Sequence, residues 1–270
     1  MKKNLDTQLL RNVIGCEAAY ACSILFPFIE NLNAVALMRY PQPPTIQTRA
    51  KLTVKEIDLA SKAAEIRKTS WFSYLEILLE LSAKADFLVD GILDAVNYHH
   101  KHSPERVWVS KTNSVSKCIM EMERSFGTTF HIALCSRVLS NESNNMHIPM
   151  LDFHVEKTSK SFEIVKKITR ILFGSNFIVL ETNRSFHSFG LVLKRDEEFK
   201  KILANSLLFA PIVDNAYVAH QLIEGEATLR ISKDITSKKA PIVVAASNHK
   251  KIFSIYNINS EESSIIEESV

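Results

Sequence analysis

Residues 148–157 read IPMLDFHVEK, and this stretch decides how the second half of the chain is expected to fold. An apolar run that begins at Ile148 ends in Asp152, Phe153 and His154. Alternate side chains of a β-strand share one face. If the run is a strand, Asp152 and His154 therefore point to one side and Phe153 to the other. A carboxylate and an imidazole on one face of a buried strand indicate a site, because burying such groups is costly without a partner or a metal ion.

The segments around this stretch alternate between β-rich and helical patterns. Apolar side chains recur at helical spacing before Gly174, and again after Asp196, which can cap a helix. β-rich runs separated by polar loops fill the rest, at residues 128–139, 146–155, 176–193, 210–218 and 227–232. The resulting order, β-β-α-β-β-α-β-β, predicts an α+β fold in which helices pack on one side of a sheet.

The rest of the chain suggests three regions. Residues 1–105 are predicted to be an α-helical N-terminal region, with a capping box formed by Thr53 and Glu56. Residues 106–250 would form the α+β core, and residues 251–270 an acidic, loose tail. The two tryptophans, Trp71 and Trp108, are expected in the core.

Composition restricts the class of protein. The chain has 270 residues, of which 46% are hydrophobic, and 33 basic against 30 acidic residues give a net charge of +3. That charge is too small to indicate a nucleic-acid-binding protein by itself, although a local basic groove remains possible. The four cysteines form no C-x-x-C pair and favour reduced thiols in a cytoplasmic protein. The apolar stretch 18–29 contains Pro27 and is too short to cross a membrane, so a buried helix is predicted there.

Polar side chains follow apolar strands at two further places. Ser185 and His187 flank Phe186 in RSFHSFG, and Asp214 ends the run APIVD. Arg230 lies inside the otherwise uncharged strand ATLRIS. Two aspartates aimed from neighbouring strands would repel each other unless a divalent cation lay between them. Carboxylates with a nearby histidine and arginine suit phosphoryl or nucleotidyl transfer.

The order and spacing of these elements resemble the catalytic core of the archaeo-eukaryotic primase superfamily, and are most similar to its bacterial primase 1D-like branch. That family carries an acidic-any-acidic strand motif, then Ser-any-His, then an apolar residue followed by Asp, and later a strand with an Arg. The four counterparts here are Leu151-Asp152-Phe153-His154, Ser185-Phe186-His187, Val213-Asp214 and Leu229-Arg230-Ile231-Ser232.

The resemblance implies an RRM-like α+β fold with an antiparallel or mixed sheet, and it implies roles for the motif residues. Asp152 and Asp214 would be catalytic and would bind one or two Mg²⁺ or Mn²⁺ ions, together with His154. Ser185 and His187 would hold the phosphates of an incoming nucleoside triphosphate, and Arg230 would lie near the nucleotide or a single-stranded nucleic-acid template.

His154 departs from the family pattern, in which the second position of the first motif is acidic. A neutral imidazole is a poorer ligand for Mg²⁺ but suits Mn²⁺, Fe²⁺ or Zn²⁺. The departure could remove a metal ion, change the preferred metal, or leave a site that binds nucleotides without joining them.

Three functions are therefore considered. The first is a primase-polymerase-type nucleotidyltransferase, and the second is a degenerate primase-like module that binds nucleotide or nucleic acid without polymerising. The third is protein interaction through the helical first half. Purely structural roles also remain open for the site residues: a local cap or ion pair for Asp152, a core histidine at position 187, a helix cap at Asp214 and an exposed strand edge for Arg230.

Overall fold

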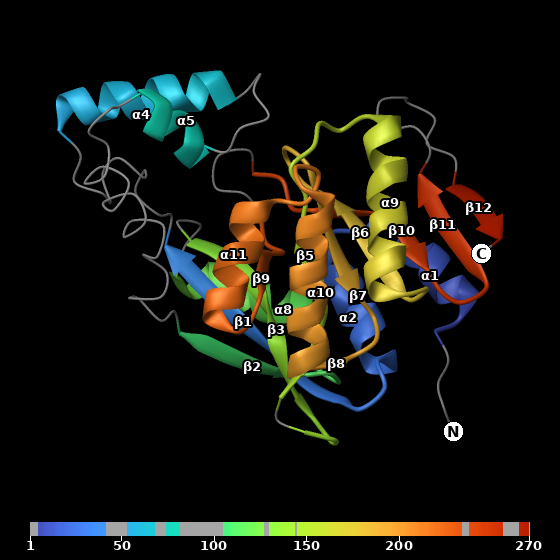
Figure 1. Ribbon diagram of the computed structural model, residues 1–270. Helices are drawn as coiled ribbons and strands as arrows, with labels where there is room; N and C mark the ends of the chain where they lie inside the picture. Colours follow the sequence, from blue (N-terminus) through green and yellow to red (C-terminus); the bar gives the residue numbers. More distant parts are fainter. Residues whose placement is uncertain are drawn as a thin grey trace. The chain divides into compact units, whose positions relative to one another are not determined.

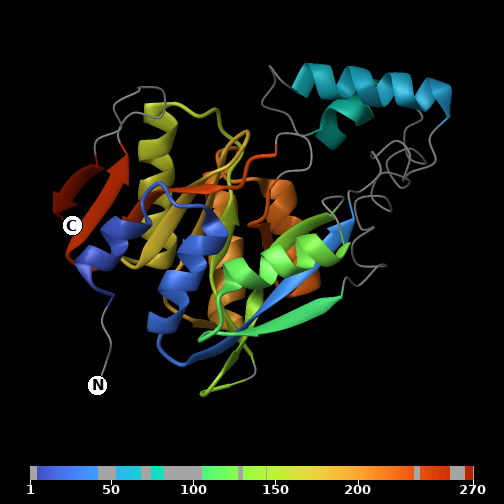
Figure 2. The same cartoon turned by 180° about the vertical axis from the view of Figure 1, so that it is seen from behind.

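The computed structural model has two compact units, Met1–Pro41 with Glu105–Val270, and Gln42–Pro104. It describes residues 5–41, 53–67, 74–81, 105–126, 130–143, 145–233, 238–255 and 265–269. Figures 1 and 2 show the fold from opposite sides.

The larger unit contains two antiparallel sheets. The first, here called the β3 sheet, has the order β2-β1-β3-β4-β8, with β9 also paired to β3. Its strands are β1 (Leu32–Pro41), β2 (Arg106–Ser110), β3 (Phe130–Ser140), β4 (Met146–His147), β8 (Lys194–Arg195) and β9 (Thr228–Arg230). The second, the β6 sheet, has the order β12-β11-β10-β6-β7-β5. Its strands are β5 (Met150–Asp152), β6 (Phe177–Glu181), β7 (Phe186–Gly190), β10 (Ile242–Ser247), β11 (Lys251–Ile255) and β12 (Ile265–Ser269).

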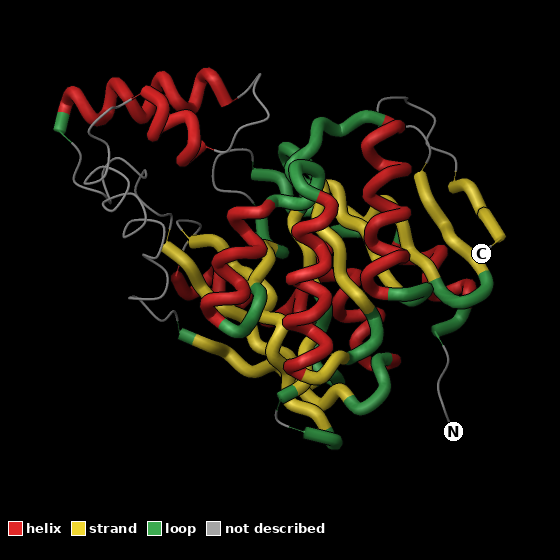
Figure 3. The backbone as a smooth tube through the Cα atoms, in the orientation of Figure 1, coloured by secondary structure: helices red, strands yellow, loops and turns green. Residues whose placement is uncertain are grey.

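Helices cover both faces of the β6 sheet. The helices α9 (Ser159–Phe173) and α10 (Asp196–Ser206) lie in front of its strands in Figures 1 and 3. The helices α1 (Thr7–Val13) and α2 (Ala18–Leu25) lie on the opposite side, in front in Figure 2, and both contact β10. The α+β class with antiparallel sheets is therefore confirmed, but the prediction of helices on one face of one sheet is wrong for the β6 sheet.

The β3 sheet has two chemically different faces. Alternate residues of β1, such as Val35 and Leu37, point into the main hydrophobic core, which α2 and α8 (Val115–Phe126) help to close. The intervening residues Ala36 and Met38 belong to a separate small cluster with Cys135. This second face is called the outer face below. Near β9 it is adjoined by α11 (Asn215–Glu224), visible in front in Figure 1.

Several segments differ from the prediction. Leu32–Pro41 falls in the region expected to be helical, yet it forms β1, because β2 and β3 pair with it on both sides. Lys251–Ile255 and Ile265–Ser269, expected in a loose tail, form the paired strands β11 and β12. Residues 210–218 were expected to be extended or mixed, yet their second half begins α11, which spans Asn215–Glu224 and is capped by Asp214.

The smaller unit contains α4 (Val54–Arg67) and α5 (Tyr74–Leu81) among its described residues. One of the two hydrogen bonds of the predicted capping box is present, because the Thr53 N–H donates to a carboxylate oxygen of Glu56. The Tyr74 hydroxyl donates to the carbonyl of Ala60 and so links the two helices. Trp71 lies outside the described residues. None of the helices among the described residues combines the length and the apolarity that crossing a lipid bilayer would take.

Gly190 in β7 fixes how closely β5 approaches its neighbour. The Gly190 N–H donates to the Pro149 carbonyl at 2.8 Å, and a Cβ added at position 190 would lie 3.1–3.2 Å from three atoms of the Pro149 ring. We predict that Gly190→Ala lowers the free energy of unfolding by about 1–3 kcal/mol, because neither the strand nor the proline ring can yield easily.

Ser188→Ala, two residues earlier on β7, is the matched control. The Ser188 hydroxyl is fully buried and has no hydrogen-bond partner among the residues that the structure describes, so its removal should be neutral or stabilising. Both effects can be measured by urea unfolding. Equal stability of Gly190→Ala and the wild type would contradict the tight packing.

Candidate functional site

The short strand β5 lies between two antiparallel partners, and this arrangement builds the site. On one side Asp152 is opposite His187 of β7. On the other side Phe153 bridges Val213, and the Asp214 N–H donates to the Asp152 carbonyl at 3.0 Å. Opposite residues of antiparallel neighbours share a face. His187, Asp152 and Asp214 therefore form one row across three chain segments that are distant in sequence.

His187 is the most enclosed member of this row. Its Nε2 lies 3.3 Å from Oδ1 of Asp152, and its Nδ1 is buried without a hydrogen-bond partner in the described structure. Burial first, and then the charge of Arg230, lower the pKa of His187 to about 3. The imidazole is therefore neutral near pH 7, with one nitrogen close to a carboxylate and the other unsatisfied.

The surroundings of Asp152 disfavour the ionised form of its side chain. Burial raises its pKa to about 7, and the negative charge of Asp214 acts in the same direction. A hydrogen bond from the Phe153 backbone and the charge of Arg230 oppose this rise only in part. A cation between the two carboxylates would relieve both the desolvation and the repulsion.

Asp214 has a structural role as well as a place in the row. Its carboxylate accepts a hydrogen bond from the Tyr217 N–H at 3.0 Å and so caps the N-terminus of α11. Asp214 is therefore a helix cap, which was the structural alternative considered for it in the sequence. Nδ1 of His154 lies 3.9 Å from its other oxygen, and the His154 side chain is 60% exposed. His154 thus borders the row on its solvent side.

Ser185 and Arg230 differ in their relation to the row. The Ser185 hydroxyl accepts a hydrogen bond from the Val155 N–H at 3.0 Å, which ties the turn before β7 to the chain after β5. Arg230 donates to the carbonyl of Ser232 at 2.9 Å, and its charge acts on both Asp152 and His187. Ser185 therefore orders the backbone beside the site, and Arg230 supplies a positive charge to it.

Tyr217 belongs to the same region, although no motif points to it. It lies in the first turn of α11, and its hydroxyl is buried with no hydrogen-bond partner in the described residues. Burial first, and then the charge of Asp152, raise its pKa well above the ordinary value. Its sequence signal was its position three residues after Asp214, because the alternative in which Asp214 caps a helix places Tyr217 in the first turn of that helix.

The donor set bears on the expected metal ion. Among the described residues, no group of three or more His, Cys, Asp or Glu side chains is gathered closely enough to hold one. Asp152 and Asp214 supply two hard oxygen donors side by side, which fits a divalent cation that keeps several waters or substrate oxygens as its other ligands. His154 borders them as a softer third donor.

A Ser–His–Asp arrangement elsewhere in the unit is structural. Nδ1 of His147 lies 3.1 Å from the Ser136 hydroxyl, and its Nε2 lies 3.4 Å from Asp196. The His147 ring stacks on Phe199, and both His147 and Ser136 are fully buried. The Ser136 hydroxyl also accepts from the Ala227 N–H at 2.8 Å. A buried serine that already bridges backbone elements cannot act as a nucleophile toward a substrate in solvent.

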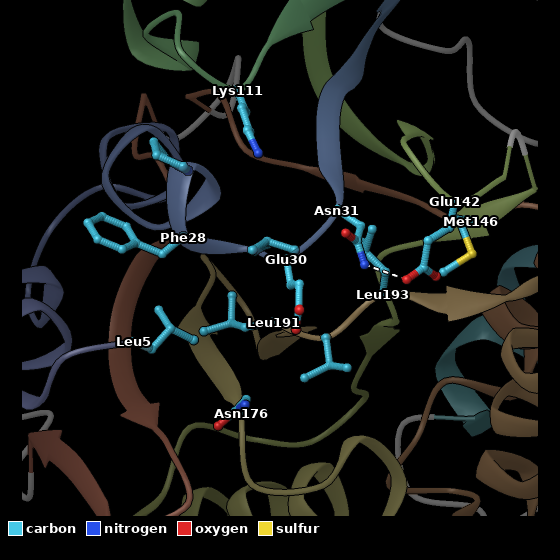
Figure 4. Close-up of a pocket in the computed structure, with 13 residues that line it drawn as sticks. Leu5, Phe28, Glu30, Asn31, Lys111, Glu142, Met146, Asn176, Leu191 and Leu193 are labelled. Carbon is cyan, nitrogen blue, oxygen red and sulfur yellow. Dashed lines mark hydrogen bonds between the residues drawn. The ribbon is translucent and has the colours of Figure 1, made fainter. Parts of the chain in front are cut away.

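A pocket of about 640 Å³ opens at a different place in this unit. Figure 4 shows Leu5, Phe28 and Leu191 on its apolar side and a hydrogen bond between Asn31 and Glu142 at its rim. None of the residues predicted for the site lines it. The chemistry indicated by the motifs is thus separate from this pocket.

Comparison with known proteins agrees with the motifs. The fold is α+β with antiparallel sheets, and the motif residues lie together at the junction of the two sheets. Residues 112–242, just under half of the chain, match the model of a family described as archaeo-eukaryotic primase 1D-like. This match confirms the resemblance noted in the sequence. No curated protein and no solved structure matches the chain.

The raised pKa of Asp152 predicts a pH-dependent stability. Its folded-state pKa of about 7 lies above the unfolded value of about 3.9, so ionisation costs stability progressively as the pH rises from about 4 to about 7. Asp152→Asn cannot ionise. We predict that the variant gains up to about 4 kcal/mol relative to the wild type between pH 4 and pH 8, because each unit of pKa difference corresponds to about 1.4 kcal/mol.

Urea unfolding of both proteins at several pH values, without divalent metal, tests this. The lowered pKa of His147, whose partners are Ser136 and Asp196, acts on both proteins alike, so the difference between the two curves reports Asp152 together with its contact to His187. A pH-independent difference would contradict the raised pKa.

Proposed function

We propose that the chain is a primase-polymerase-type nucleotidyltransferase that uses nucleoside triphosphates, a nucleic-acid template and Mg²⁺ or Mn²⁺. One observation supports this above all. Within the segment that matches the primase 1D-like family, the three motif side chains His187, Asp152 and Asp214 are adjacent in one row. Two repelling carboxylates beside a buried histidine and an arginine suit a substrate that brings phosphate oxygens and a cation together.

The residues have distinct tasks in this proposal. Asp152 and Asp214 hold the divalent cation, which when bound neutralises charge on the triphosphate. His187, whose Nε2–H faces the Asp152 carboxylate at 3.3 Å, orients that carboxylate beside the phosphates, and Arg230 adds a fixed positive charge. A 3′-hydroxyl oxygen forms a bond to the α-phosphorus in line with the departing pyrophosphate, whose bond to that phosphorus breaks. The proton of the hydroxyl passes to solvent or to a neighbouring carboxylate.

Primer extension tests the proposal. We expect the wild-type protein to extend a primed template with Mg²⁺ or Mn²⁺, and Asp152→Ala and Asp214→Ala to lower the rate at least about 100-fold, because each removes a cation ligand. Glu197→Ala is the matched control, since Glu197 is an exposed acidic residue on α10 outside the row. Because Asp214 also caps α11, Asp214→Asn, which keeps a capping oxygen, separates loss of the cation from loss of the helix.

A binding module without catalysis is the second candidate, and two observations favour it. His154 replaces the second acidic residue of the first motif, and the described residues contain no group of three metal-binding side chains. If the wild type incorporates no nucleotide with either metal but binds triphosphate or oligonucleotide, the protein is a binding module, and the proposal of a nucleotidyltransferase is wrong.

His154 offers a gain-of-function test. His154→Asp restores a carboxylate next to Asp214, so we expect Mg²⁺-supported extension to rise about tenfold relative to Mn²⁺-supported extension, because Mg²⁺ prefers oxygen ligands. The ratio of the two rates is the measurement, and His154→Ala is the control for removal of the imidazole alone. An unchanged ratio in His154→Asp would show that position 154 does not touch the cation.

A further inference from the structure

Trp108 is exposed, although the sequence predicts a tryptophan in the core. It lies on β2, the last strand at one end of the β3 sheet in the part of the chain that the structure describes, and 42% of its surface is accessible. Strand β1 pairs with one edge of β2, so the backbone groups of the other edge have no strand partner among the described residues. An open strand edge of this kind is a template for pairing with a further strand.

Other strands at the ends of the two sheets carry features that discourage such pairing. Strand β8 has only two residues, and both are basic. Strand β12 carries two adjacent glutamates, so pairing it with a second copy of itself would bring like charges together. Strand β2 has five residues, and its single charged side chain, Arg106, contacts Glu226 of its own chain. The edge of β2 is therefore long enough for pairing and lacks the usual protection by charge.

The sequence of β2 and its two flanking residues is complementary to a second copy of itself. If two copies pair in antiparallel orientation about a two-fold axis at Trp108, this residue lies opposite Trp108 of the second copy. Val107 then lies opposite Val109. Glu105, just before β2, lies opposite Lys111, just after it, and the symmetry repeats this pair at the other end. Aromatic, β-branched and oppositely charged pairs across strands all stabilise an antiparallel sheet.

The faces of β2 also match in such a pair. Val107 and Val109 point toward the main core, whereas Trp108 lies on the outer face, opposite Ala36. The two indoles would therefore meet on the outer face, where each now leaves a large apolar surface in water. Two rings packed against each other at the seam would bury that surface.

The two charged residues that flank β2 are available to a second copy. The Glu105 side chain is 69% exposed, and its ion pair with Arg39, at 3.6 Å, is a surface pair that contributes little within the chain. Lys111 lies at the rim of the pocket in Figure 4 and forms no ion pair with any residue that the structure describes. Each can therefore exchange its present surroundings for the opposite charge on the second copy.

The edge of β2 is separate from the candidate site. Strands β1 and β3 lie between β2 and β9, which carries Arg230. Three strand-to-strand steps of about 4.8 Å give about 14 Å between β2 and β9. Pairing at β2 therefore leaves the row of His187, Asp152 and Asp214 uncovered.

We propose that the chain forms a two-fold symmetric dimer in which β2 pairs with β2 of a second copy, so that two β3 sheets join into one continuous sheet. The match between the residues before and after Trp108 identifies the partner as a second copy of this chain, because a different protein requires no such self-complementarity. The inference does not rest on the proposed function.

Charge reversal in the full chain tests the pairing by analytical ultracentrifugation. Glu105→Lys places lysines opposite each other and Lys111→Glu places glutamates opposite each other, so each variant should weaken the dimer about tenfold. The double variant restores opposite charges and should recover the wild-type dissociation constant. Positions 105 and 111 of one chain are about 20 Å apart along the strand, so this recovery cannot arise within a single chain.

Trp108→Glu is a stronger disruption of the same interface. It removes the central indole pair and places two carboxylates at the two-fold axis, so the dissociation constant should rise at least about 100-fold. Tyr20→Glu is the matched control, because Tyr20 is an aromatic residue on α2 with 52% exposure, and the variant should remain as dimeric as the wild type. Urea unfolding of each variant separates a lost interface from a lost fold.

The outcomes separate this inference from the proposed function. A dimeric wild type that Trp108→Glu dissociates and the double charge variant preserves supports the inference, even if no nucleotide is incorporated. A monomeric wild type overturns it, and so does a dimer that persists in Trp108→Glu. A dimer that the single charge reversals weaken but the double variant does not recover also overturns it, whether or not primer extension depends on Asp152.

Discussion

The antiparallel pairing of β5 on both of its sides is the constraint on which the site depends. β7 fixes Asp152 opposite His187, and the Val213 segment fixes it next to Asp214. β5 has only three residues, so a slip of one residue would turn Asp152 away from both neighbours and bring Phe153 out of the core. Phe153 is 2% exposed and packs in the main hydrophobic cluster, so burial of this ring holds the polar row in register.

The same constraint explains the electrostatic state of the site. The two carboxylates repel each other, and the negative charge of Asp214 raises the pKa of Asp152 in addition to burial. Folding imposes this repulsion through backbone hydrogen bonds, and Asp214 is additionally committed to the cap of α11. The positive charge of Arg230 stabilises the ionised form of Asp152 but also disfavours a protonated His187. The fold therefore keeps two carboxylates close together and the histidine neutral, a combination that suits an incoming cation.

Local sequence patterns predicted many of the helices and strands and the grouping of the site residues. The features that they did not predict depend on pairing between strands that are distant in sequence. Alternation in IPMLDFHV gave the shared face of Asp152 and His154, and helical spacing gave α9 and α10. The strand β1 was missed because an apolar run such as LNAVALM suits a helix or a strand, and its partner β3 is about 100 residues away. The exposure of Trp108 could not be predicted either, since it depends on β2 being an edge strand. Whether Asp214 is a cap or a cation ligand was left open by the sequence, and its two oxygens can do both.

The exposed fractions of the three motif side chains explain how the site can accept a histidine instead of an acidic residue at position 154. The His154 side chain is 60% exposed, whereas the side chains of Asp152 and Asp214 are 29% and 22% exposed. A charge in water interacts weakly with a cation, while a desolvated carboxylate interacts strongly. The two positions that keep their aspartates are therefore those at which a carboxylate contributes most, and the substituted position is the one at which water can supply the missing ligand. The replacement weakens the outer edge of the site and leaves its buried row intact.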